Sequence, residues 1–205
     1  MLSERNKQVI KKILDAVHYD YESALREGPW GHWARTVMYR ECFKLVRELG
    51  PANLDVLEIS AGTAWKPLGF QSFTEANFPE FDVCSMTLPS RFDLIIADQV
   101  FEHLLWPYRA GRNVHSMLKP GGHFLVSTPF LIKVHESPVD CSRWTELGLK
   151  HLLAECGFPL EGIRTGSWGN RACVRANFRR WARKGFRSLA NEPEFPVTVW
   201  ALAKK

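Results

Sequence analysis

Apolar side chains recur three or four positions apart over residues 9–17 and again over residues 37–46. This spacing predicts amphipathic helical segments between residues 3 and 49. An aromatic loop over residues 28–33 interrupts them, and Gly50-Pro51 ends the region. We therefore expect an N-terminal helical cap over residues 1–50.

From residue 54 onward, short apolar runs alternate with helical patterns. Strands are predicted at residues 54–60, 71–75, 81–84, 92–97, 123–127 and 197–203, helices at 104–117 and 146–156, and a turn at 119–122. This alternation predicts an α/β fold, a doubly wound, mostly parallel sheet with helices on both faces. Residues 51–205 would form this domain as one compact unit with the cap. Ligands of such sheets bind beyond the carboxyl ends of the strands.

Composition places the chain among ordinary globular proteins. Of its 205 residues, 45% are hydrophobic and 24% are charged, and no apolar run approaches the length of a bilayer span. The polar start, Met1 to Lys7, lacks the apolar core of a secretory signal. Five scattered cysteines without a C-x-x-C pair indicate reduced thiols. We expect a cytoplasmic protein.

The most informative segment is the loop that follows the first predicted strand. Glu58-Ile59-Ser60-Ala61-Gly62 is an apolar strand end followed by small residues, which leave backbone N–H groups uncovered for a polar ligand. The dinucleotide spacing G-x-G-x-x-G is absent, so the loop alone is compatible with several nucleotides.

Five local patterns in a fixed order narrow this choice. They are Leu57 to Gly62; Leu88-Pro89 followed by Phe92-Asp93-Leu94-Ile95; Gln99-Val100-Phe101-Glu102-His103-Leu104; Leu118-Lys119-Pro120-Gly121-Gly122; and the segment from His135 to Phe158. Together they resemble the class I S-adenosylmethionine-dependent methyltransferases, whose fold is Rossmann-like. The resemblance covers residues 54–158, and the predicted terminal strand fits the last strand of that fold.

The resemblance implies a binding site for S-adenosylmethionine. The first loop, Glu58, Ser60, Ala61 and Gly62, would line the methionine end, with Glu58 orienting the loop or the ammonium group. Glu75, after the second strand, would bind the ribose hydroxyls, or else be a solvated turn residue.

Two further segments belong to this implied site. Cys84, Ser85 and Met86 would provide backbone contacts and an apolar wall for the adenine. Strand alternation is expected to turn Asp82 elsewhere. Asp98 and Gln99, after the fourth strand, would contact the methionine end, although Asp98 is also a candidate helix N-cap.

The chain departs from the family pattern in three places. Ser60 and Ala64 replace usual glycines, and Cys84 stands where an acid usually contacts the adenine amino group. The first helix must also be short, because Gly62 and Glu75 lie so close in sequence. Ser and Ala are small enough to keep the loop open, so we expect cofactor binding to survive.

Glu102 and His103 raise the question of a metal. Some relatives with Glu-x-x-Glu-His hold a divalent metal, but Gln99 replaces the first acid here. Even with His135 added, three scattered ligands are a weak signature, and we expect no metal. His103 is expected beside the cofactor or substrate, and Glu102 in a local pair.

The loop from His135 to Thr145 would face the methyl-transfer cleft. It resembles the H-x-x-P-x-D-x-x-R-x-T pattern of a subgroup associated with sugar and glycan modification. His135 and Asp140 are candidate bases for a hydroxyl acceptor, and His103, expected beside the cofactor or substrate, is a third candidate catalytic residue. Alternatively, Asp140 and Arg143 form a structural ion pair, with Thr145 capping the next helix.

Basic charge is concentrated in one segment. Residues 171–187 hold six arginines and one lysine without an acid, while the whole chain carries +5. A helix here would align five arginines in a ridge beside aromatic residues: Arg171, Arg175, Arg179, Arg183 and Arg187. This ridge is a solvated face or a contact surface for an anionic membrane or phosphorylated carrier. Nucleic acid is less favoured, because no RNA-binding motif accompanies it.

An aromatic group precedes the core domain, consisting of Tyr19, Tyr21, Trp30, His32 and Trp33. Its members suit stacking on a sugar or flat ligand, or packing against the sheet. The leading hypothesis is O-methylation of a sugar or glycan hydroxyl. The alternatives are methylation of a small aromatic or polyketide-like metabolite, RNA methylation, and a non-catalytic module that recruits an anionic partner through the ridge.

Overall fold

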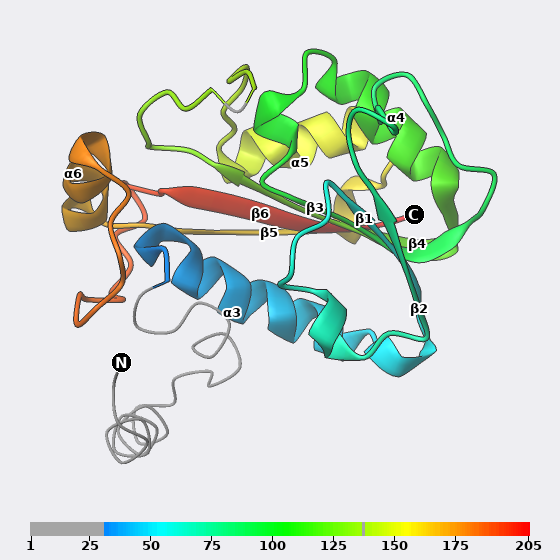
Figure 1. The fold of residues 1–205 in the computed structure, drawn as a ribbon, viewed down its shortest axis with the longest axis horizontal. Helices are drawn as coiled ribbons and strands as arrows, with labels where there is room; N and C mark the ends of the chain where they lie inside the picture. Colours follow the sequence, from blue (N-terminus) through cyan, green and yellow to red (C-terminus); the bar gives the residue numbers. More distant parts are fainter. Residues whose placement is uncertain (1–30, 137) are drawn as a thin grey trace.

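A six-stranded sheet in the order β2-β1-β3-β4-β6-β5 forms the centre of the molecule (Figure 1). The computed structural model describes residues 31–136 and 138–205. Its strands are β1 (Asp55–Ile59), β2 (Ser72–Ala76), β3 (Phe92–Asp98), β4 (Leu118–Pro129), β5 (Ile163–Trp168) and β6 (Thr198–Lys204). Strand β6 is antiparallel to β4 and β5, and the other neighbours pair in parallel. The predicted mostly parallel α/β sheet is confirmed.

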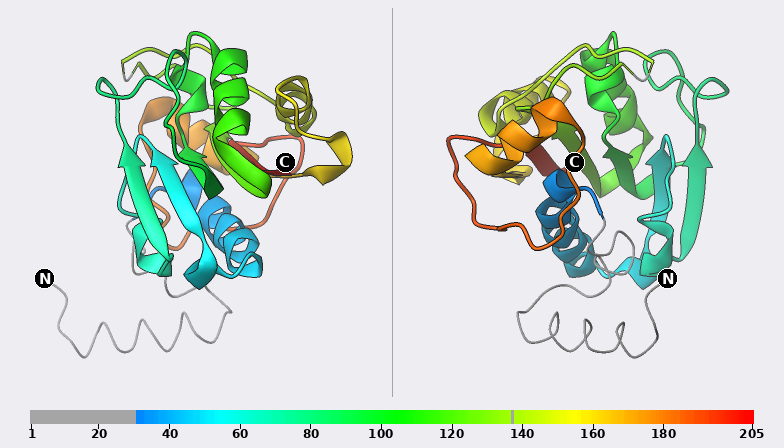
Figure 2. Two further views of the ribbon diagram at one scale, coloured as in Figure 1. Left: turned by 90° about the vertical axis from the view of Figure 1, so that its right-hand side faces the viewer. Right: turned by 60° about the vertical axis from the view of Figure 1, so that its left-hand side comes forward.

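Helices cover both faces of this sheet (Figure 2). Helix α3 (Trp33–Glu48) packs on one face, and α4 (Pro107–Met117) and α5 (Glu146–Glu155) pack on the other. Helix α6 (Arg171–Arg179) follows β5, and short 3-10 turns lie at Pro51–Asn53, Lys66–Leu68, Phe101–His103 and Leu160–Gly162. The second predicted segment of the cap is α3. The first, over residues 9–17, lies outside the described residues, as do Tyr19, Tyr21 and Trp30.

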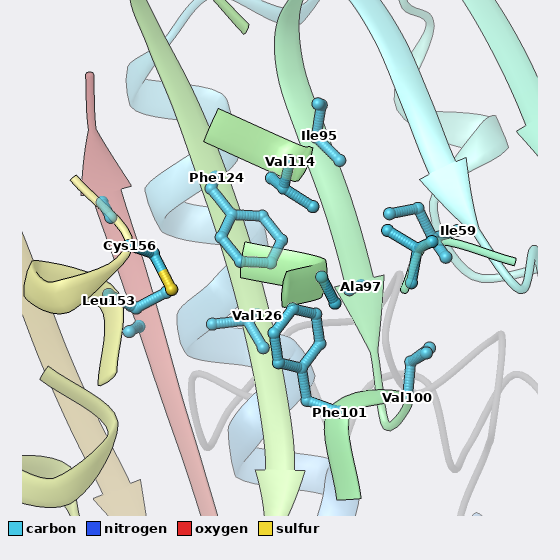
Figure 3. Packing of buried hydrophobic residues seen from close by; sticks show 14 of the residues in the cluster. Ile59, Ile95, Ala97, Val100, Phe101, Val114, Phe124, Val126, Leu153 and Cys156 are labelled. Carbon is cyan, nitrogen blue, oxygen red and sulfur yellow. The ribbon is translucent and has the colours of Figure 1, made fainter. Parts of the chain in front are cut away.

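Strand alternation divides the core into two layers. Along β3, Leu94 and Ile96 point toward α3, whereas Ile95 and Ala97 point toward α4 and α5. Figure 3 shows the second layer, where Ile95 and Val114 lie close to the Phe124 ring. All of these side chains are fully buried, and each contributes roughly 1–3 kcal/mol by leaving water. This doubly buried strand rigidly positions the loop that follows it.

The strand predicted over residues 81–84 is wrong. The N–H groups of Ser85 and Met86 donate to the carbonyl of Asp82, at 3.0 and 2.8 Å, and the Asp82 carboxylate accepts from the Cys84 N–H at 2.9 Å. The acid thus closes a turn with its own neighbours, which competes with a sheet ladder. Strand β2 is therefore the edge of the sheet.

Three further features differ from prediction. The helix expected from Leu104 begins at Pro107, whose fixed φ suits a first helical position. Residues 119–122 form no separate turn but an irregularity within β4, where Gly121 has a φ of 75° and the pairing with β3 shifts. Strand β5 was not predicted, because its sequence, Ile-Arg-Thr-Gly-Ser-Trp, has little apolar alternation.

The predicted arginine ridge is wrong as a single helical feature. Helix α6 ends at Arg179, and the buried Asn177 side chain accepts a hydrogen bond from the Ala182 N–H at 3.0 Å. The chain then runs beside the start of α3. There the backbone N–H of Trp33 donates to the carbonyl of Ala182, and the backbone N–H of Lys184 donates to the carbonyl of Gly31. Arg183 and Arg187 therefore lie on a non-helical segment. No helix among the described residues is long and apolar enough to cross a bilayer.

Candidate functional site

A cavity of about 890 Å³ opens at the carboxyl ends of β1, β3 and β4. Ile59 and Ser60, Gln99 and Val100, and Pro129 line it at these three strand ends. Strand β1 has β2 on one side and β3 on the other, and the chain runs from β1 to β2 and then crosses over to β3, so this is the switch point of the sheet. Its size is that of a small-molecule site.

Ser60 and Gln99 turn the chain sharply at this point. Both have a φ of 57°, in the left-handed region, and both line the cavity. The Ser60 N–H donates to Ala76 at 2.9 Å and the Gln99 N–H donates to Ser127 at 3.0 Å, so each turn is fastened to a neighbouring strand. A left-handed non-glycine residue costs about 1–2 kcal/mol. The fold therefore accepts strain where the predicted cofactor loop begins.

The first loop is fixed by two side chains. Glu58 accepts a hydrogen bond from the Gly62 N–H at 3.1 Å, and Asn77 accepts one from the Ala61 N–H at 2.7 Å. Glu58 is only 2% exposed, and burial raises its pKa to about 7. Its predicted role in orienting the loop agrees with this contact. Asn77 was missed, and its sequence signal was a polar residue directly after β2.

Asp98 is a structural junction. Its carboxylate accepts hydrogen bonds from the Tyr39 hydroxyl at 2.7 Å, the Ser127 hydroxyl at 2.5 Å and the Trp65 indole N–H at 3.4 Å. These bonds connect the end of β3 to three other parts of the chain: to α3, to the loop that follows β1, and to β4. The alternative of a helix N-cap is wrong, because the next helical turn begins at Phe101 with Val100 as its N-cap.

Only some of the other predicted cofactor residues line the cavity. Cys84 lines the cavity, and so does Asp82, because no strand forms there to turn it away. Glu75 is exposed and lies 3.4 Å from the Lys66 ammonium. Eight of the predicted site residues are not among those lining the cavity: Glu58, Ala61, Gly62, Glu75, Ser85, Met86, Asp98 and Asp140.

His103 and His135 come together at the wall of the cavity, with ring centroids 5.0 Å apart. Burial lowers the pKa of His135. The His103 Nε2 lies 3.6 Å from the carboxylate of Glu102, a residue without exposed surface whose pKa burial raises to about 8. The expected local neighbour of Glu102 is thus His103.

Asp140 fixes the loop that carries His135. It accepts two hydrogen bonds from the Arg143 guanidinium and one from the His135 backbone N–H at 2.8 Å. The guanidinium holds the pKa of Asp140 below its usual range. This is the structural ion pair among the alternatives, and Thr145 caps α5 as predicted by accepting from the Gly148 N–H.

Several residues that line the cavity were not among the predicted site residues. Arg35 lies at the start of α3, Trp106 precedes α4, and Trp181 follows α6. His32, a member of the predicted aromatic group, lines the cavity. Burial lowers the pKa of its imidazole to about 4. Trp33 instead packs in the core beside Trp168.

Comparisons with known proteins identify the family of the chain. A family model described as a methyltransferase domain matches residues 30–161, so the chain belongs to that family. No curated protein matches.

Solved structures share the fold. A methyltransferase from Mesorhizobium loti is 18% identical with a TM-score of 0.55, covering 84% of this chain and 98% of its own. One from Archaeoglobus fulgidus is 13% identical with a TM-score of 0.57, covering 83% and 94%. The glycopeptide N-methyltransferase MtfA, with S-adenosylhomocysteine bound, is 14% identical with a TM-score of 0.52, covering 80% and 88%.

The methyltransferase class predicted from the sequence is confirmed by this family match, and the resemblance to the family implies S-adenosylmethionine as the cofactor. The cavity fits this cofactor in chemistry. Ile59, Phe81 and Val83 provide an apolar wall, while Ser60 and Gln99 add polar groups at the switch point. Apolar pockets with a few well-placed polar groups are typical of cofactor sites.

The strain at Ser60 is testable. We predict that Ser60→Gly raises the free energy of unfolding by about 0.5–1 kcal/mol, because glycine relieves the left-handed strain at a smaller entropic cost. Ala61→Gly is the matched control, since Ala61 has no positive φ, and it should lower stability. Urea unfolding measures both. An equal decrease in the free energy of unfolding in the two variants would contradict backbone strain at Ser60.

Proposed function

We propose that this methyltransferase transfers the methyl group to a hydroxyl of a sugar or glycan. The observation that carries the proposal is the pair of imidazoles, His103 and His135, at the wall of the switch-point cavity. A hydroxyl is a poor nucleophile until its proton is drawn away, and neutral imidazoles can assist this. S-adenosylmethionine supplies the electrophilic methyl group when bound.

The cofactor-binding roles follow the sheet. We propose that the Ser60–Gly62 loop and Gln99 contact the methionine end, with Glu58 and Asp98 holding these segments from behind. Cys84, with Ser85 and Met86 behind it, would border the adenine. Glu75 remains our candidate for the ribose hydroxyls, in which case it must leave Lys66 on binding.

The rest of the cavity supports a sugar acceptor. Trp106 and Trp181 line it, and the two residues are 54% and 39% exposed. Such rings can stack on the apolar face of a sugar. His32 and Arg35 add polar groups on the same cavity wall. This combination favours a polyhydroxylated acceptor over a flat hydrocarbon.

We predict that His135→Ala lowers turnover by about 100-fold or more, because an acid-base group typically contributes this much. Affinity for S-adenosylhomocysteine should change less than about twofold, since His135 faces the acceptor side. His151→Ala, an exposed histidine on α5, is the matched control and should behave as wild type.

The same assay tests the acceptor. Transfer of isotopically labelled methyl is measured to a panel of sugars and to matched amino sugars. Methylation at oxygen, lost in His135→Ala, is the expected result. Methylation only at nitrogen would overturn the proposal, as would unchanged turnover in His135→Ala.

We also propose that the basic segment, residues 171–187, contacts an anionic membrane that presents the acceptor. Arg175, Arg179 and Arg180 are exposed in this segment, and so are Phe178, at 56%, and Phe186, which is fully exposed. Arginines with exposed aromatics are typical of membrane-surface contacts. Trp181 belongs both to this segment and to the cavity, so a bound bilayer would lie near the acceptor side.

We predict that the double variant Arg175→Gln/Arg179→Gln binds vesicles containing phosphatidylglycerol at least about tenfold more weakly, because each cation near an anionic surface contributes about 1 kcal/mol. Arg91→Gln/Arg112→Gln removes the same charge elsewhere and is the control. Co-sedimentation is the measurement. Equal binding to pure phosphatidylcholine vesicles, or no binding at all, would contradict the proposal.

A further inference from the structure

We propose that Glu102, His103 and His135 bind a divalent transition-metal cation at the wall of the cavity. One ligand atom from each residue lies within 4.8 Å of the others. Glu102 and His103 belong to the short turn after β3, whereas His135 comes from the loop after β4. The set joins two chain segments that only the folded sheet brings together.

Glu102 is the unusual member of the set. It has no exposed surface, and neither carboxylate oxygen has a hydrogen-bond partner among residues 31–136 and 138–205. An isolated buried carboxylate costs several kcal/mol, whereas pairing with a cation removes most of that cost. A buried carboxylate without a hydrogen-bond partner, next to a histidine that lines a ligand cavity, is therefore a candidate cation ligand.

His103 is oriented as a metal ligand. Its Nδ1 faces the Val139 carbonyl, which can only accept, so Nδ1 carries the hydrogen and Nε2 carries the lone pair. Histidines that bind metals usually donate their second ring N–H to a carbonyl or carboxylate in this manner. The lone pair of His103 is thus directed toward Glu102.

The separations are close to those of a shared ion. Glu102 Oε1 and His103 Nε2 are 3.6 Å apart, too far for a hydrogen bond. Two donor atoms each about 2.1 Å from one ion are roughly 3.0–3.4 Å apart. Even at the full 4.8 Å, His135 needs to approach by only about 1–2 Å, within the reach of side-chain rotation.

The loop that carries His135 is already fixed. The Asp140 carboxylate accepts a hydrogen bond from the His135 backbone N–H at 2.8 Å, and it also accepts one from the Arg143 guanidinium. The His135 ring also packs edge-on to Trp181, at 5.6 Å between centroids. Asp140 is therefore a positioning residue for a ligand.

Two imidazoles and one carboxylate favour a first-row transition metal over Mg²⁺, which prefers oxygen ligands. Three protein ligands leave coordination positions for exogenous oxygen. The inference deepens the proposed function: an acceptor hydroxyl in such a position would have a lowered pKa. His103 and His135 would then assist proton removal as ligands of the ion.

Titration with Co²⁺ in the absence of cofactor and acceptor tests the proposal. After treatment of the full chain with a chelator, we expect one Co²⁺ per chain with a visible d–d band. His103→Ala, His135→Ala and Glu102→Gln should each weaken binding at least about tenfold. If Glu102→Gln does not fold, the two histidine variants decide.

Controls exclude other ligands. His151→Ala and His18→Ala remove histidines outside the set, and Cys141→Ser removes an exposed thiol whose sulfur lies 3.9 Å from the His103 carbonyl. All three should leave Co²⁺ binding unchanged. A Kd for Co²⁺ above about 1 mM, or Co²⁺ binding that is unchanged in both histidine variants, would overturn the proposed metal site. Methylation of a sugar hydroxyl that is lost in His135→Ala, measured separately without added metal, would still support the proposed function in that case.

Discussion

The hydrogen bonds accepted by Asp98 hold the functional end of this molecule together. One carboxylate at the end of β3 receives the hydroxyls of Tyr39 and Ser127 and the indole N–H of Trp65. The donors come from α3, from β4 and from the segment after β1, so four parts of the chain meet at one side chain. Hydrogen bonds to a charged acceptor are the stronger ones, and several on one carboxylate fix their elements mutually. The position of the cavity follows from this junction.

The first loop is organised by side chains where related loops rely on glycine. Ser60 adopts a left-handed conformation without being glycine, and Glu58 and Asn77 accept the hydrogen bonds of the next two N–H groups. The buried Glu58 carboxyl supports the loop from beneath. A tightly held loop is preorganised, which reduces the ordering cost of ligand binding. Fewer glycines therefore need not mean a weaker site.

Much of the fold was predictable because its signals are local. The apolar run of β3, the small residues after β1 and the Thr145 cap of α5 each follow from neighbouring residues. The segment after Phe81 was not predictable from periodicity, since a single Asp82 side chain converts an apparent strand into a turn. The path of Arg183 and Arg187 depends on pairing with the start of α3, more than 140 residues away in sequence.

The residues that line the cavity were predictable only in part. Ser60, Cys84, Gln99, His103 and His135 all line the cavity. The junction role of Asp98 was not visible, because its donors Tyr39 and Trp65 are brought to it only by packing. The same holds for Glu102, whose burial beside two histidines depends on the loop after β4. Motifs identify the residues on the strand ends, whereas tertiary packing decides what each one contacts.

Calorimetric titration with S-adenosylhomocysteine tests directly whether the strained loop at the switch point is a working cofactor site. If it is, we expect saturable binding of one ligand per chain with a Kd below about 100 μM. Absence of any binding heat at high micromolar ligand, over a range of temperatures, would contradict it.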